Sequence, residues 1–350
     1  MAQGSLNGPP RAAGRQAPLR GGLLARFGRS EAAVAQTLIT PGQLLLLFVI
    51  LFPAVVAIYI SFTGWTPQSG TPWYEAYKDW LWLDNYWEAL SGGAFWSAVW
   101  RTVLVTVLAV GIEFLLGFAL ALLVLKEFRG RSLLVVVFLL PMMVVPAVTG
   151  FIFFMLFQDD GPVNEGLTWL LPGTVNVGWL TDPDIALYSV VLADVWQWTP
   201  LMFLILLSGL VALPEDQMNA ARILGAGWFF QLRHLVLPMM KPIILIALII
   251  RAMETLKLFD AAWLMTQGGP GDATQTMSVY LYRETFIGTR WGYTSAVAIL
   301  VLILVSIIAL RAIRPIEAAS QEIAEDGAPP AAGEVGITLE EAIEAETAAR

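Results

Sequence analysis

Ionisable side chains inside apolar segments are the residues of this chain best placed to do chemistry. Glu113, Asp194 and Arg251 each lie in a run of mostly apolar residues. A charged side chain costs about 2.5 to 3.5 kcal/mol at the centre of a bilayer even on the gentler insertion scale, so it indicates a bundle interior or a watery path. Three more charged residues follow Arg251 at close spacing: Glu254, Lys257 and Asp260.

The sequence leaves two interpretations of these charged residues open. Residues three and four apart share a helix face, so Glu254 can pair with Arg251 or Lys257 and form an internal set of salt bridges. The alternative is the lining of a path for a polar solute. A carboxylate and a guanidinium bind the hydroxyl groups of a neutral polyhydroxyl ligand, and the same guanidinium also suits a phosphate or sulfonate group.

Several classes of chemistry are excluded by residue type. The chain has no cysteine and a single histidine, so it lacks a thiolate nucleophile and a multi-histidine metal site. No phosphate-binding loop of the Gly-x-x-x-x-Gly-Lys-[Ser/Thr] type occurs, so ATP must bind to another chain. We therefore expect no catalytic residue, metal or cofactor on this chain, and no enzymatic activity.

The elements that carry these charges are predicted to cross a membrane. Of the 350 residues, 57% are hydrophobic and 14% are charged, and the mean hydropathy is +0.68. This exceeds what one soluble core could bury, so the composition predicts an all-α membrane protein. Six stretches fit transmembrane helices: about 38–62, 99–125, 133–157, 185–212, 243–265 and 293–313. The fifth is the least regular, because charged residues interrupt it after Ile250.

Orientation follows from the positions of Lys and Arg. Of the 20 basic residues, 14 lie on one side of the six spans, counting both termini, and this side is predicted to be cytoplasmic. We divide the chain into a basic segment 1–36, a six-span domain 37–314 and a tail 315–350. The tail holds nine acids against Arg350 and few large apolar residues, so it is predicted to be disordered.

The inner segment 213–241 is unusually long for a connection in a compact bundle. Its pattern predicts a helix from Glu215 to Leu224, a turn at Gly225 and Gly227, and a second helical piece that stops at Pro238. Met218, Ala221 and Arg222 fall on one face of the first piece.

The spacing of this segment resembles the signature of bacterial ABC-importer permeases. Asn219-Ala220-Ala221, then Gly225, then Leu235-Val236-Leu237-Pro238 match the pattern Glu-Ala-Ala, Gly, Ile-x-Leu-Pro with every interval kept. The chain departs from it at Asn219 and Leu224, where acids are usual. The resemblance implies the type I importer permease fold and a segment that docks on an ATPase subunit. The implied coupling residues are Met218, Asn219, Ala220, Ala221, Arg222, Gly225, Ala226 and Gly227.

Other stretches resemble the carbohydrate-importing branch of that family, of the maltose or glycerol-phosphate type. The most specific is "LKLFDAAWLMTQGGPGDATQTMSVYLYRETF", with Phe259-Asp260 and Gly268-Gly269-Pro270. By its spacing the resemblance implies contacts to the sugar from two spans, with Gln197 adding an amide. Trp198 is open to packing or to stacking on a sugar ring. The predicted substrate residues are Asp194, Gln197, Trp198, Leu201, Arg251, Glu254, Thr255 and Leu258.

The resemblance implies a permease subunit, in a bacterial inner membrane, of an ATP-driven importer for a sugar or polyol. Its expected partners are a second permease chain, two ATP-binding subunits that hold ATP and Mg²⁺, and an extracytoplasmic solute-binding protein, with no nucleic acid. The alternative is an ion- or proton-coupled secondary carrier or channel that uses the acids of the spans as a relay. That alternative predicts inverted repeats, and none stands out in the sequence.

Overall fold

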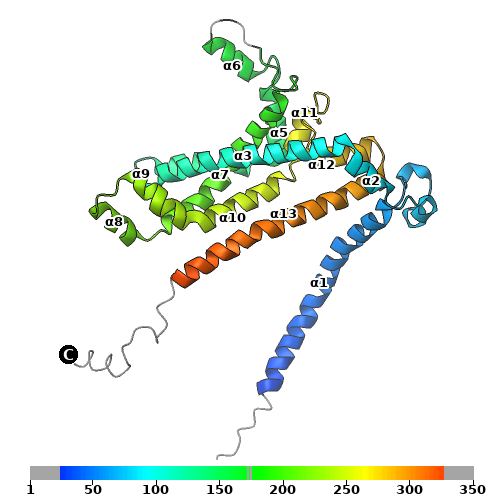
Figure 1. The fold of residues 1–350 in the computed structure, drawn as a ribbon, viewed down its shortest axis with the longest axis horizontal. Coiled ribbons are helices and arrows are strands. Elements are labelled where there is room, and N and C mark those ends of the chain that lie inside the picture. The colour runs from blue at the N-terminus through cyan, green and yellow to red at the C-terminus, as the bar shows by residue number, and fades with distance from the viewer. Residues whose placement is uncertain (1–23, 172, 174–175, 327–350) are drawn as a thin grey trace, which may run out of the picture. The chain divides into compact units, whose positions relative to one another are not determined.

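The computed structural model describes residues 24–171, 173 and 176–326 (Figure 1). In this part the chain is helical, and the extended backbone pairs only in an isolated antiparallel bridge between Thr63 and Trp80. This confirms the predicted all-α fold. The predictions for residues 1–23 and for the tail beyond Asp326 lie outside the described residues.

Two compact units divide the chain, Met1–Ala57 and Ile58–Arg350. The first unit holds most of α1 (Leu24–Ser61). From Leu44 to Val55 its large side chains are apolar and exposed, as expected of a helix that meets lipid. Because α1 begins at Leu24, the predicted basic segment 1–36 is helical in its last third.

Six spans are present when one bent helix pair is counted as a span. Five helices of the described part are long and apolar enough to cross a membrane, and the pair supplies the sixth. Their order confirms the prediction. The spans are Leu38–Ser61, α3 (Gly93–Leu125), the pair Arg131–Met143 with Pro146–Leu156, α7 (Ala186–Val211), Trp228–Thr255, and Trp291–Arg311 within α13 (Trp291–Asp326).

The third span is broken where two prolines lie close together. After α4 (Arg131–Leu139) and the short η3 (Pro141–Met143), the chain turns by 97° into α5 (Pro146–Leu156). Proline has no N–H and fits only the first turn of a helix, so each proline begins a new helical piece. Val144 and Val145 between the pieces are extended.

The fifth span starts earlier than predicted. Helix α9 (Trp228–Gln231) continues through a π-helical turn, η4 (Leu232–Val236), into α10 (Leu237–Thr255). The prediction that the helix stops at Pro238 is therefore wrong. Pro238 lies in the first turn of α10 directly after the π turn, where the ladder of hydrogen bonds is already out of register and a missing N–H is tolerated.

The same span also ends earlier than predicted. Helix α10 stops at Thr255, and residues from Asp260 form a separate helix, α11 (Asp260–Thr266). Ala261, Ala262 and Met265 pack in an apolar cluster with side chains of α5 and α7. The apolar run after the charged residues thus belongs to a separate helix that packs on α5 of the third span, not to the fifth span.

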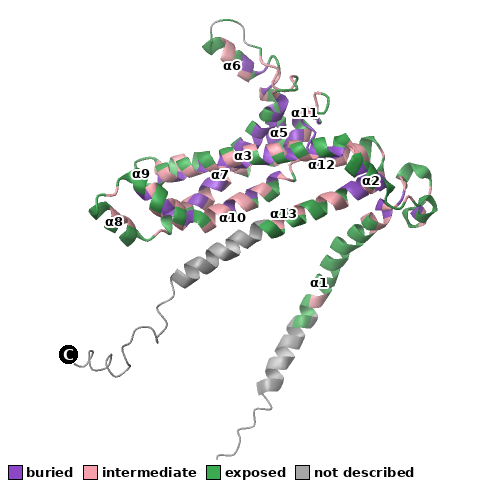
Figure 2. Ribbon diagram, in the orientation of Figure 1, coloured by how far each residue is buried: buried purple, intermediate pink, exposed green. Residues whose placement is uncertain are grey.

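Helix α7 is the centre of the second unit. In its most apolar stretch 61% of the residues are buried, against 33% for α3 and 22% for the fifth span, and Figure 2 shows the buried colour along α7. A Cβ on Gly117 of α3 would lie 2.9 Å from the backbone nitrogen of Phe203 of α7. Gly117 and the fully buried Ala121 therefore allow the close approach of α3 and α7 that small residues permit.

Helix α13 continues through Asp326, so the helix includes the start of the predicted tail 315–350.

The remaining elements connect the spans. The other elements are η1 (Pro67–Ser69), η2 (Trp73–Asp79), α2 (Asp84–Ser91), α6 (Pro162–Leu170), α8 (Glu215–Ile223), α12 (Met277–Tyr282) and η5 (Arg283–Ile287), a π turn.

Candidate functional site

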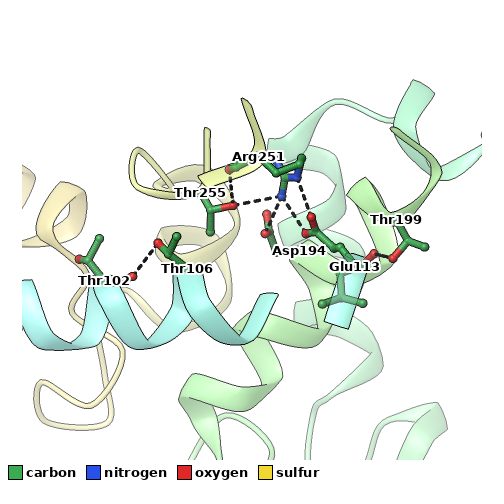
Figure 3. Close-up of polar contacts among 8 residues, drawn as sticks. Thr102, Thr106, Glu113, Asp194, Thr199, Arg251 and Thr255 are labelled. Atoms are coloured by element: carbon green, nitrogen blue, oxygen red, sulfur yellow. Dashed lines mark hydrogen bonds and ion pairs between the residues drawn. The ribbon is translucent and has the colours of Figure 1, made fainter. Parts of the chain in front are cut away.

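The charges predicted inside the spans form one buried cluster from three helices. Arg251 of α10 donates from Nε to Glu113 Oε2 of α3 at 2.7 Å and from Nη2 to Glu113 Oε1 at 2.8 Å. Nη2 also donates to Asp194 Oδ2 of α7 at 3.0 Å and to Thr255 Oγ1 at 3.1 Å. Figure 3 shows these four side chains pointing toward one another.

Local structure explains why the three charges meet. Glu113 lies one helical turn before Gly117, where α3 and α7 approach most closely. Thr255 follows Arg251 by one turn, and its hydroxyl donates to the Arg251 carbonyl at 2.9 Å while it accepts from the guanidinium. These contacts fix the direction of the Arg251 side chain toward α3.

The cluster is closed to solvent in this conformation. Glu113 is 0% exposed, Asp194 2% and Arg251 1%. Buried charges persist only when paired and hydrogen-bonded, and a bidentate guanidinium–carboxylate pair is among the strongest such contacts. The cluster therefore ties the second, fourth and fifth spans together across the bundle.

Two further predicted residues adjoin the cluster. The Arg251 guanidinium lies 5.0 Å from the centre of the Trp198 ring, within the range of a cation–π contact. Gln197 donates from Nε2 to the carbonyl of Val144 at 2.7 Å and so satisfies the backbone at the break of the third span. The break and the charged cluster are thus held by neighbouring residues of α7.

Other predicted residues are not brought to the cluster. Glu254 is exposed and pairs with Lys257 at 2.9 Å, the second of the two partners foreseen for it. Leu201 is half-buried, and Leu258 is half-buried against apolar clusters of α5, α7 and α3. The internal salt-bridge set therefore exists, but it runs between helices and not along the fifth span.

Glu113 is the member that the predicted site omits. The only signal for it in the sequence is that it is the sole acid of a long apolar run. Which distant cation such an acid pairs with depends on helix packing, and no spacing rule within one helix applies to residues 138 positions apart.

The inner segment forms the predicted projecting helix. Helix α8 carries Glu215 and Asp216 in its first turn and Arg222 in its last. These charges interact favourably with the helix dipole and so stabilise the helix. Gly225 adopts φ +83°, where a side chain would be strained, and so permits the turn. Ala226 closes this turn through its N–H to the Ala221 carbonyl at 2.9 Å.

Helix α8 offers an exposed apolar end. Ile223 and Leu224 are 87% and 86% exposed, and Trp228 and Phe229 beyond the turn are also exposed. Met218 is half-buried against the core of α3, α7 and α10, so its side chain packs on the bundle.

A cavity of about 560 Å³ separates α8 from the inner ends of the spans. Its lining includes Lys126, Arg131, Asn219, Arg222 and Trp228. One side of α8 thus borders this cavity, and Met218 packs on the core of α3, α7 and α10.

Known proteins are similar to this chain in sequence and in fold. The family described as "Binding-protein-dependent transport system inner membrane component" matches residues 113–318. The probable ABC transporter permease protein y4oQ of Sinorhizobium fredii is 38% identical over 261 residues, or 74% of this chain and 82% of that protein. The trehalose/maltose transport system permease protein MalF of Thermococcus litoralis is 34% identical over 250 residues, or 68% of this chain and 83% of that protein.

Among solved structures, a chain of a bacterial ABC transporter involved in the import of the acidic polysaccharide alginate has a similar fold. The TM-score is 0.69 at 19% sequence identity, and the match covers 84% of this chain and 98% of that chain. This likeness confirms the predicted importer-permease fold.

Proposed function

This chain belongs to the family of binding-protein-dependent transport system inner membrane components, and on that premise we propose that it is a permease subunit for a sugar or polyol. The observation that carries the proposal is the extent of the match: residues 113–318 include the charged cluster and the inner helix α8 together. Three relatives of 30% identity or more are named for the transport of trehalose/maltose, sulfoquinovosyl glycerol and trehalose.

The proposed complex has separate chains for separate tasks. This chain pairs with a second permease to enclose the path, and two ATP-binding subunits hold ATP and Mg²⁺. An external solute-binding protein delivers the sugar. The exposed end of α8, with Ile223 and Leu224, is the surface that docks on an ATP-binding subunit. Asn219 and the other predicted coupling residues lie on or beside that helix.

Coupling follows from the continuity of the fifth span. The helix from Trp228 to Thr255 has 28 residues, about 42 Å at 1.5 Å per residue. Its inner end follows α8 through the Gly225 turn, and its other end carries Arg251 and Thr255. Closure of the ATP-binding subunits moves α8, and the helix transmits that motion to the charged cluster.

Opening of the path is then the movement of α7 away from α10, while the Arg251–Glu113 pair keeps α10 on α3. Separation exposes Asp194, Trp198 and Thr255, whose carboxylate, ring and hydroxyl can bind a polyhydroxyl ligand. Hydrolysis of ATP on the partner subunits allows the cluster to close again. No covalent chemistry takes place on this chain.

The test is reconstitution of the chain in proteoliposomes with its partner permease and ATP-binding subunits. We expect the rate of ATP hydrolysis to rise on addition of the binding protein with sugar, and sugar to accumulate inside. Ile223→Asp on α8 should abolish the stimulation, while Ile287→Asp in η5, which is also exposed and lies outside the inner segment, is the matched charge-insertion control. Sugar uptake by this chain without the ATP-binding subunits would instead establish the secondary carrier.

A further inference from the structure

Arg251 has no complete bidentate edge for a substrate while Glu113 is in place, because Nη2 belongs to both edges of the guanidinium and already donates to Glu113. Glu113 takes Nε and Nη2 in two parallel bonds of 2.7 and 2.8 Å. Asp194 and Thr255 take further bonds from Nη2, and Trp198 lies beside the guanidinium at 5.0 Å from its ring centre. Proteins recognise phosphate and carboxylate groups through the same bidentate edge that Glu113 occupies here.

The charge of the cluster also opposes an anion. One guanidinium faces two carboxylates, so the cluster carries an excess of one negative charge when all three groups are ionised. The groups are almost fully buried, and interactions between charges are screened least in such surroundings. With all three groups ionised, an anionic sugar entering between the helices would meet an excess of its own sign.

The two acids are placed differently. Glu113 uses both oxygens on Arg251. Asp194 uses Oδ2 alone toward Arg251. Glu113 is therefore the partner that neutralises and holds the arginine, and Asp194 is the acceptor left for a hydroxyl group.

We propose that Glu113 is a specificity-determining residue that withholds Arg251 from acidic groups, so that the path accepts uncharged sugars or polyols and rejects those bearing a phosphate, sulfonate or carboxylate. This inference rests on the proposed sugar permease function. Glu113 acts through Arg251 and does not itself contact the sugar, so it is a positioning residue.

The experiment uses the reconstituted importer without its binding protein, so that the selectivity of that protein does not enter. Importer loaded with a non-hydrolysable ATP analogue is given radiolabelled neutral probes: trehalose, maltose and glycerol. The probe that binds is then displaced by its own phosphorylated derivative or by the unlabelled neutral form. The ratio of the two displacement constants measures discrimination against the added charge.

We expect the wild-type importer to prefer the neutral form by about 30-fold or more, the scale set by loss of one buried charge pair. Glu113→Gln keeps the shape and removes one negative charge, so the preference should fall by about 30-fold with little change in affinity for the neutral probe. Glu113→Asp should retain the preference. Glu75→Gln, in the exposed outer pair with Lys78, is the matched charge-removal control and should behave as wild type.

A merely structural role for Glu113 would weaken binding of both forms and leave their ratio unchanged, which would overturn the inference. If Glu113→Gln does not assemble, Asp194→Asn removes the same charge; it should lower the preference and also weaken the neutral probe, because an acceptor is lost. Preference of the wild type for the phosphorylated form also overturns the inference but leaves the proposed function standing. The proposed function itself fails if no sugar, neutral or anionic, stimulates ATP hydrolysis when delivered by the binding protein.

Discussion

Removal of Arg251 separates the contribution of the cluster to folding from its contribution to transport. In the wild-type protein Glu113 and Asp194 both contact the Arg251 guanidinium within 3.0 Å. The substitution Arg251→Met leaves the two acids buried without a cation. Breaking a buried ion pair by deleting one partner costs about 3–5 kcal/mol, because a charge is left uncompensated. The free energy of unfolding should fall by that amount, equivalent to roughly 10 °C in melting temperature.

Replacement of the whole cluster should have a different effect. The triple variant Arg251→Met, Glu113→Leu, Asp194→Leu removes every charge together, and apolar replacement of a buried ion cluster is often neutral or stabilising by about 1–4 kcal/mol. We therefore expect a melting temperature at or above that of the wild type. Sugar uptake should nevertheless be lost, because the polar lining of the path is gone.

The assay is thermal unfolding of the purified complex, followed by intrinsic tryptophan fluorescence, alongside uptake in proteoliposomes. Arg283→Met is the matched control, since its 2.9 Å pair with Asp272 is partly exposed and such pairs contribute about 0–1 kcal/mol. An Arg251→Met variant as stable as the wild type would refute the conclusion that Arg251 is buried and paired with Glu113 and Asp194. A triple variant that still transports sugar would refute the role of the cluster in the path.

Three further predictions concern packing, the broken span and coupling. Gly117→Ala should destabilise the protein by about 1–3 kcal/mol, since its Cβ would lie 2.9 Å from the Phe203 nitrogen, whereas Gly111→Ala, with no atom within 4 Å, should be neutral or stabilising in the same melting assay. Gln197→Leu leaves the Val144 carbonyl without its side-chain donor, so stability should fall by about 1–3 kcal/mol and amide exchange at the break should speed up. Ile223→Asp should leave the melting temperature within about 2 °C, because the side chain is 87% exposed, while sugar-stimulated ATP hydrolysis is lost.

The spans and their break could be predicted from sequence because both depend on local properties. Length and hydropathy identify a membrane helix, and proline removes a hydrogen-bond donor wherever it stands. Pro141 and Pro146 are local signals of this kind at the bend of the third span. The helix of the inner segment was predictable for the same reason, since its acidic first turn and the glycine at its end are adjacent to it.

The ends of the fifth span could not be predicted in this way. Pro238 indicates a stop only if the helix is regular, and the π turn before it changes that condition. The separate helix α11 reflects tertiary packing: Gly150 of α5 leaves room for the backbone of Ala261, 2.9 Å from where a Cβ would lie. Such a contact joins residues far apart in sequence and has no local signature.

The pairing of Arg251 has the same origin. Within its own helix the spacing offered Glu254, but that residue is better solvated on the exposed face, where it meets Lys257. A buried guanidinium must be neutralised where it lies, and α3 and α7 each bring one acid to that depth. Spacing within a helix thus identifies the partner of an exposed charge, whereas burial decides the partner of a charge inside the bundle.

The fifth span serves both the coupling to α8 and the charged cluster of the path, and its structure explains why one helix does both. A lever requires a rigid element, and the helix from Trp228 to Thr255 is continuous apart from the π turn near its inner end. Its charged end is held by two other spans through bonds that are strong when made and costly when only half broken. The Arg251–Asp194 contact to α7 therefore favours two discrete states, made or fully separated, over intermediate ones. Motion of α8 would therefore switch the cluster between these states, as a path open to only one side at a time requires.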